Sequence, residues 1–95
     1  MFKNHRYATC GVNARIPILT QLILWGMIDD LKAIEQDYFQ VFRLSEEDGM
    51  QKVIHEQEQT EYKRTCLFGG VEPVNEKIYV IDSIDYSTML LAEEY

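Results

Sequence analysis

The stretch FQVFRLSEEDGMQKVIHEQ, residues 39–57, decides the fold that we expect for this chain. Apolar and polar side chains alternate along much of it, and a period of two is typical of strands with one buried face. Asp48-Gly49 supplies the positive φ angles that a two-residue hairpin turn requires, so the stretch predicts an antiparallel hairpin. Counting outward from that turn predicts two facing pairs, which are Leu44 with Val53 and Phe42 with His55.

One strand and one helix are expected before the hairpin. Residues 6–12, RYATCGV, contain Tyr, Thr and Val and indicate a short strand. Pro17 suits the first position of a helix, and residues 17–36 are mostly good helix formers, broken only by Gly26. At ~100° per residue, one face of this helix is apolar and is expected to pack on a sheet. Its members are Leu19, Ile23, Leu24, Met27, Leu31 and Ile34.

The opposite face of the expected helix is also rich in apolar residues. It carries Ile18, Gln21, Trp25, Ile28 and Lys32. A surface helix of a small two-layer protein is ordinarily polar on this side. We therefore take Ile18, Trp25 and Ile28 as a candidate interaction surface, because Trp and exposed apolar patches are common at association sites.

Three more strands are expected after the hairpin. EYKRTCLF at residues 61–68 indicates a strand, and GGVEPVN at 69–75 indicates a loop. KIYVIDS at 77–83 and STMLLAEEY at 87–95 indicate a second hairpin, although TMLLAEE also contains helix formers. The expected order is β-α-β-β-β-β-β. This order predicts an α+β fold in which one main helix packs on one face of an antiparallel β-meander.

Length and composition indicate one domain, residues 1–95, because 95 residues that are 46% hydrophobic suffice for one core. The formal charge is −7, and the basic residues are scattered along the chain. We therefore do not expect a nucleic-acid binder, although an acidic decoy for a DNA-binding protein stays open. The apolar run at residues 16–28 falls short of the roughly 20 residues of a membrane span. With no signal peptide and only Cys10 and Cys66, we expect a cytoplasmic protein.

HEQEQ, residues 55–59, resembles the zinc-protease signature HExxH but has Gln59 where the second histidine belongs. On a strand, Glu56 points away from His55, so the two cannot share a metal ion as they would on a helix. We expect His55 to be a partly buried or rim residue of the sheet. Asp82, Ser83, Asp85 and Ser87 indicate turn capping rather than a cation site. We expect no cofactor, no metal ion and no catalytic residue.

The alternative is a small enzyme or ligand-binding protein with a pocket that uses His55, Arg64 and Cys66. Arg64 lies two residues from Cys66 on the expected strand and could lower the pKa of that thiol. No base for the thiol is identifiable from the sequence, so a half-buried structural cysteine is the simpler interpretation. This alternative requires that the three side chains meet in one concave site.

Several segments together resemble domain of unknown function 960 (DUF960), a small family typical of low-GC Gram-positive bacteria. They are RYATCGVN, ILTQLILWGMIDDLK, YFQVFRLS, KVIHEQEQTEYK and IYVIDSIDYSTMLLAEEY, and they span essentially the whole chain. The ending STMLLAEEY is the most specific part. The resemblance implies a bacterial, cytoplasmic setting and transfers no functional residue. From the residues themselves we predict a non-enzymatic interaction domain that binds another protein or forms a homodimer.

Overall fold

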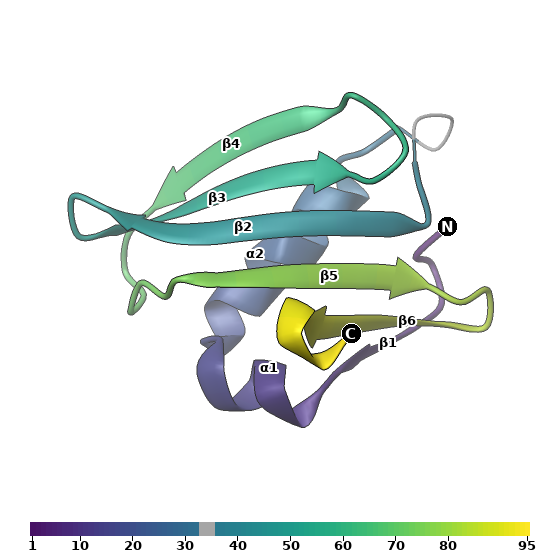
Figure 1. Cartoon of the computed structure of the whole chain (residues 1–95), viewed down its shortest axis with the longest axis horizontal. Coiled ribbons are helices and arrows are strands. Elements are labelled where there is room, and N and C mark those ends of the chain that lie inside the picture. Colours follow the sequence, from purple (N-terminus) through teal and green to yellow (C-terminus); the bar gives the residue numbers. More distant parts are fainter. Residues whose placement is uncertain (33–35) are drawn as a thin grey trace.

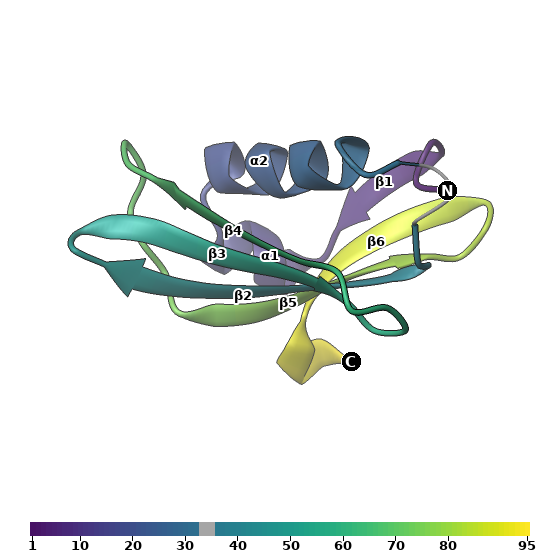
Figure 2. The same ribbon diagram turned by 90° about the horizontal axis from the view of Figure 1, so that it is seen from above.

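The structure, a computed structural model that describes residues 1–32 and 36–95, has one six-stranded sheet with helices on one face (Figures 1 and 2). The strands are β1 (His5–Ala8), β2 (Phe39–Glu47), β3 (Met50–Gln57), β4 (Lys63–Phe68), β5 (Glu76–Asp82) and β6 (Tyr86–Leu91). The helices are α1 (Cys10–Arg15) and α2 (Ile18–Asp29), and a 3₁₀ turn, η2 (Ala92–Glu94), ends the last strand. Figure 2 shows α2 on one side of the sheet and η2 on the other.

The strand order β1-β6-β5-β2-β3-β4 confirms the predicted α+β class with a mostly antiparallel sheet and one main helix. Two features depart from a simple meander. β5 pairs with β2 rather than with β4, and β1 pairs with β6 in parallel. Each departure joins segments that are far apart in the chain, so local sequence patterns carry no signal for it.

The buried side chain of Gln51 explains how the chain crosses from β4 to β5. Its Nε2 donates to the carbonyl oxygens of Ser45 (2.9 Å) and Val74 (3.1 Å), and its Oε1 accepts from the N–H of Val74 (2.8 Å). Gln51 lies on β3 and Val74 lies in the loop between β4 and β5. The side chain therefore satisfies the backbone of a loop that passes the end of the first hairpin.

The first hairpin forms as predicted. Asp48 and Gly49 have φ angles of 53° and 78°, as a two-residue turn with two positive φ values requires. Leu44 faces Val53 and Phe42 faces His55 in the observed register. The turn chemistry and the alternation of side chains both act over a few residues, so the sequence alone was sufficient to predict the hairpin and its register.

The N-terminal strand is shorter than predicted. It ends at Ala8, and residues 10–15 form α1 instead of continuing the strand to Val12. Thr9 caps this helix because its Oγ1 accepts from the N–H of Val12 at 3.2 Å. The capping Thr was the available signal for this helix.

The predicted rotation of α2 is wrong. Leu19 was expected on the inner face but is 48% exposed, whereas Ile28 was expected on the outer face and is fully buried. The described helix also ends at Asp29, and Ile34 lies outside the described residues. Apolar residues surround almost the whole helix, so its sequence offers little contrast between the faces. The residues that face the sheet are Thr20, Gln21, Leu24, Met27 and Ile28.

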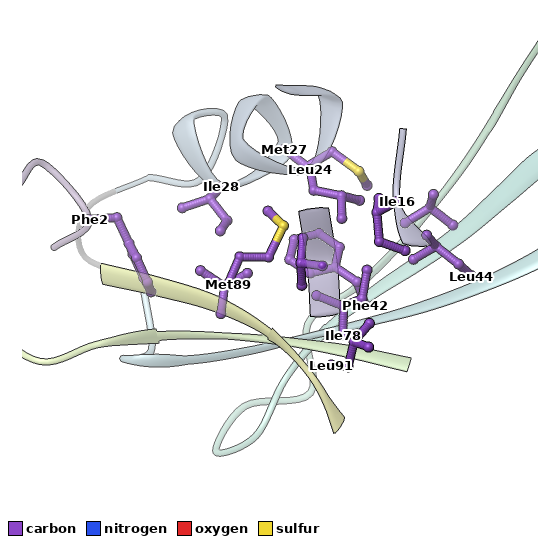
Figure 3. Close-up of a cluster of buried hydrophobic side chains, with 13 residues drawn as sticks. Phe2, Ile16, Leu24, Met27, Ile28, Phe42, Leu44, Ile78, Met89 and Leu91 are labelled. Carbon is purple, nitrogen blue, oxygen red and sulfur yellow. The ribbon is translucent and has the colours of Figure 1, made fainter. Parts of the chain in front are cut away.

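Figure 3 shows the core between α2 and the sheet. Leu24, Met27 and Ile28 of the helix point toward Phe42, Ile78 and Met89 of three strands. Phe2 closes one end of this cluster and Ile16 lies near the other. The core therefore fills only the side of the sheet that carries α2. No helix in the described part of the chain is long and apolar enough to span a membrane.

Candidate functional site

His55 lies in the core, although we expected a partly buried or rim residue of the sheet. Its side chain is fully buried and its ring stacks on Phe42, with ring centroids 4.3 Å apart and an interplanar angle of 15°. Tyr62 meets the same ring edge-on at 5.2 Å. The alternation of β3 places His55 on the helix-covered face of the sheet, which the hairpin register had already implied.

A row of buried polar side chains surrounds His55 on one side. Its Nε2 lies 2.6 Å from Oε1 of Gln40. Nε2 of Gln40 donates to Oε1 of Gln57 and to the carbonyl oxygen of Asp37, both at 2.7 Å. Because Gln40 must present its oxygen to the ring, the geometry selects the tautomer of His55 that carries the proton on Nε2. Nδ1 has no hydrogen-bond partner among the described residues.

Burial and, to a smaller extent, the positive charge of Arg64 lower the pKa of His55 to about 4. An imidazolium would lose its hydration in the core and would lie beside a guanidinium. His55 is therefore neutral at pH 7. A neutral ring that hydrogen-bonds through Nε2 and stacks on Phe42 serves packing and network geometry.

Arg64 and Cys66 lie on β4 beside His55, but the three do not form a reactive site. Arg64 faces His55 across the β3–β4 pair, and Cys66 faces Val53. Arg64 extends outward to Asp30, with Nη1 3.0 Å from Oδ2. The ring of His55 is inaccessible to solvent, so a substrate in contact with Arg64 would not reach it. Cys10, the other cysteine, is exposed at the start of α1.

The outer face of α2 carries the exposed apolar surface that the sequence suggested, with different members. Ile18 is 68% exposed and Leu22 is 59% exposed. At ~100° per residue, these two residues lie in line with Gly26, and Leu19 lies beside them. Trp25 is half-buried, with the guanidinium carbon of Arg6 4.7 Å from its ring centroid. We call Ile18, Leu19, Leu22, Trp25 and Gly26 the outer helix surface; Ile28 is excluded because it is buried.

The outer helix surface is uncharged, and the acidic residues at its end are paired. Residues 18–28 contain no Asp, Glu, Lys or Arg, in a chain where 26% of the residues are charged. Asp29 pairs with Arg6 at 2.5 Å, and Asp30 pairs with Arg64. A solvent-facing helix normally carries charged side chains on its outer face. This surface is therefore unusual for an element that faces only water.

The sheet face opposite α2 forms a second surface, which we call the open face. It has a depression of about 290 Å³. Phe39 and Tyr79 contribute aromatic rings whose centroids are 4.9 Å apart, and Tyr95 meets both rings edge-on. The residues that line the depression are Phe39, Val41, Arg43, Glu56, Gln57, Glu58, Lys77 and Tyr79.

Basic side chains gather on the open face although they are far apart in the sequence. The strand register places Arg43 opposite Lys77, and Glu56 opposite Lys63. Nε of Arg43 lies 2.7 Å from Oε1 of Glu56. This hydrogen bond is the main factor that holds the pKa of Glu56 below its usual value, and the charges of Arg43, Lys63 and Lys77 act in the same direction. Three cations thus surround one carboxylate.

The side chain of Asp82 caps a turn, as predicted. Its Oδ1 accepts from the N–H of Ile84 and from Nδ2 of Asn4, both at 2.9 Å, and its Oδ2 accepts from the N–H of Phe2. These three donors stabilise the carboxylate and lower the pKa of Asp82, against the effect of its partial burial. The described residues contain no cluster of three or more His, Cys, Asp or Glu that could hold a metal ion.

The comparisons with known proteins identify relatives without a known activity. The family model of DUF960, a staphylococcal protein of unknown function, matches residues 5–94. The crystal structure of a protein of unknown function from Enterococcus faecalis is similar to this chain, with a TM-score of 0.84 and 25% sequence identity. That similarity covers 97% of this chain and 91% of that chain. No curated protein matches this chain significantly.

Proposed function

This chain belongs to the DUF960 family of staphylococcal proteins of unknown function, and we propose that it is a non-enzymatic, cytoplasmic interaction domain that binds a second copy of itself. The observation that carries the proposal is the outer helix surface, in which Ile18, Leu19 and Leu22 are exposed on a helix face without charges. Burial of exposed apolar area is the main favourable contribution to protein association.

The absence of charged side chains from this surface allows a second copy to occupy it. Two copies of a chain with formal charge −7 repel each other over most of their surfaces. The outer helix surface is a region where two copies can meet without bringing unpaired charges together. The pairing of Asp29 with Arg6 and of Asp30 with Arg64 supports this at the end of the helix. A symmetric dimer buries the same patch on both copies, so the patch must be self-complementary.

The size of the patch indicates a weak, concentration-dependent dimer. A stable interface buries about 800 Å² on each partner, and three exposed aliphatic side chains supply only part of that area. Trp25 and its cation–π partner Arg6 extend the patch along the helix. We therefore expect reversible dimerisation that weakens on dilution. The two free cysteines, of which Cys10 is exposed, support a reducing compartment such as the cytoplasm.

Light scattering across a concentration range tests the proposal. We expect a monomer at low concentration, a dimer at high concentration, and a larger dimer fraction in added salt because salt screens the repulsion between the acidic copies. Leu22→Asp should leave a monomer at every concentration, because the introduced carboxylate would be buried against its own copy. Leu67→Asp is the matched control, since Leu67 is also an exposed leucine (43%) but lies on β4.

Three results would overturn the proposal. One is a wild-type protein that remains monomeric up to the highest concentration reached. Another is a dimer that persists in Leu22→Asp while circular dichroism shows an intact fold in both variants. Loss of the dimer in Leu67→Asp alone would move the interface away from α2 and would equally reject it.

A further inference from the structure

The open face has features of a recognition surface that are independent of the outer helix surface. The two lie on opposite sides of the sheet, because α2 covers one side and η2 lies on the other (Figure 2). Each of the four adjacent strands β5, β2, β3 and β4 contributes a basic residue to the open face. These are Arg43 on β2, Lys52 on β3, Lys63 on β4 and Lys77 on β5, four of the nine Lys and Arg residues of the chain.

The open face has one more cation than it has carboxylates, because Arg43, Lys52, Lys63 and Lys77 share it with Glu47, Glu56 and Glu58. Arg43, Lys63 and Lys77 all act on the single carboxylate of Glu56. Lys52 is paired separately, with Nζ 3.5 Å from Oε1 of Glu47. This concentration of cations contrasts with the formal charge of −7 for the whole chain. An anionic partner is therefore attracted to this face and repelled by most of the remaining surface.

Aromatic rings lie directly beside these cations. Nζ of Lys77 lies 5.3 Å from the ring centroid of Tyr79, and Phe39 and Tyr79 are in edge-to-face contact. The chain's own Tyr95 already adds a third ring to this pair, with its centroid 5.5 Å from Phe39 and 5.4 Å from Tyr79. Phe39 itself is buried, so half-buried Tyr79 and exposed Tyr95 are the rings of this cluster that a partner can reach.

We propose that the open face binds an acidic peptide segment with aromatic side chains, its carboxylates on Arg43, Lys63 and Lys77 and a ring against Tyr79 and Tyr95. The depression of about 290 Å³ is shallow and open, so it suits a chain that lies across the sheet. A small molecule would need a pocket that encloses most of its surface. Nucleic acid is disfavoured because it carries a phosphate at every nucleotide and needs a longer continuous basic surface, whereas a peptide can place its carboxylates only where Arg43, Lys63 and Lys77 lie.

Fluorescence anisotropy tests the proposal with a short fluorescein-labelled peptide in which glutamate and phenylalanine alternate. We expect saturable binding that weakens as salt is added. The double variant Arg43→Gln/Lys77→Gln should weaken binding by about tenfold, because two charge-assisted contacts are lost. Glu56→Gln should strengthen binding several-fold, because it removes the carboxylate that competes for Arg43.

Matched probes and variants separate specific binding from general attraction. Lys3→Gln/Lys32→Gln removes the same charge from two exposed residues outside strands β2 to β5 and should leave the affinity unchanged. A peptide with glutamine in place of glutamate, and one with serine in place of phenylalanine, should each bind at least tenfold more weakly. Circular dichroism of every variant establishes that the fold is retained.

Three outcomes would overturn the inference. The first is no saturable binding of the glutamate–phenylalanine peptide by wild-type protein. The second is an equal loss of affinity in the two double variants, which would indicate attraction without a site. The third is a single-stranded DNA oligonucleotide of the same charge that competes as well as the peptide, which would assign the open face to nucleic acid.

Discussion

Nε2 of His55 and Oε1 of Gln40 lie 2.6 Å apart inside the core, where both side chains are fully buried. Gln40 is held in turn by Gln57 and by the carbonyl oxygen of Asp37. The contact connects the middle of the first hairpin to the segment that precedes β2. It therefore links the interior of the sheet to the point where the chain enters it.

Acidification should destabilise the fold through His55. Its folded pKa of about 4 is below the ordinary value of 6.5, so between these pH values the unfolded chain binds a proton that the folded chain does not. The free energy of unfolding should therefore fall as pH is lowered from 6.5 toward 4, by on the order of 3 kcal/mol from this residue. Urea unfolding at intervals between pH 7 and pH 4 measures the slope.

His55→Gln is the control for this pH dependence, because glutamine retains an N–H donor for Gln40 and does not titrate. The variant should be less stable at pH 7 but should lose less stability between pH 6.5 and pH 4 than the wild type. Carboxylates such as Asp82 are present in both proteins and cancel in the comparison. A pKa near 6.5 for His55 in an NMR titration would contradict the expectation.

Gln40→Leu should destabilise the protein by about 1–3 kcal/mol. The substitution retains an apolar side chain of similar length but leaves Nε2 of His55 and the carbonyl oxygen of Asp37 buried without this partner. Gln59→Leu is the matched control on an exposed residue, and we expect an effect within about 0.5 kcal/mol. Denaturant midpoints at pH 7 give both values. Equal stability of Gln40→Leu and wild type would show that the network adds nothing.

Gly11→Ala should lower the melting temperature by loosening the C-terminal turn. A Cβ at Gly11 would lie 2.7 Å from Oε2 of Glu94, so that carboxylate must move. Its Oε1 accepts from Oγ1 of Thr9 (2.7 Å) and from the N–H of Leu91 (2.8 Å), and these bonds would be lost. Glu94→Ala removes the same bonds, so the double variant should melt at nearly the temperature of Glu94→Ala alone. Additive shifts measured by calorimetry would contradict this coupling.

The first hairpin and the candidate sites differ in how far the sequence could predict them. The hairpin depends on Asp48-Gly49 and on alternation within a few residues, and its pairing of Phe42 with His55 was predicted and is observed. Thr9 is a typical helix N-cap and could have predicted α1, but it lies within residues 6–12, which we expected to form a strand. The exposure of Ile18 was anticipated, whereas Leu19 and Leu22 were missed because the rotation of α2 was wrong.

The clustering of cations on the open face could not be predicted from the sequence, because these residues are far apart in the chain. Arg43, Lys63 and Lys77 lie on three strands, and the sequence suggested only scattered basic residues. Strand alternation gives the face of each residue, but the distance between them depends on which strands are neighbours. The placement of β5 beside β2 brings Lys77 opposite Arg43.

The sequence by itself determined the α+β class, the single main helix and the turn of the first hairpin. These follow from local energetics: the backbone preferences of Asp-Gly, the missing N–H of Pro17 and the change of apolar period from helix to strand. Only the tertiary structure decided the strand order, the buried face of α2 and the surroundings of His55. The apolar residues of α2 surround the helix, so packing against Phe42, Ile78 and Met89, and not local preference, selects its orientation.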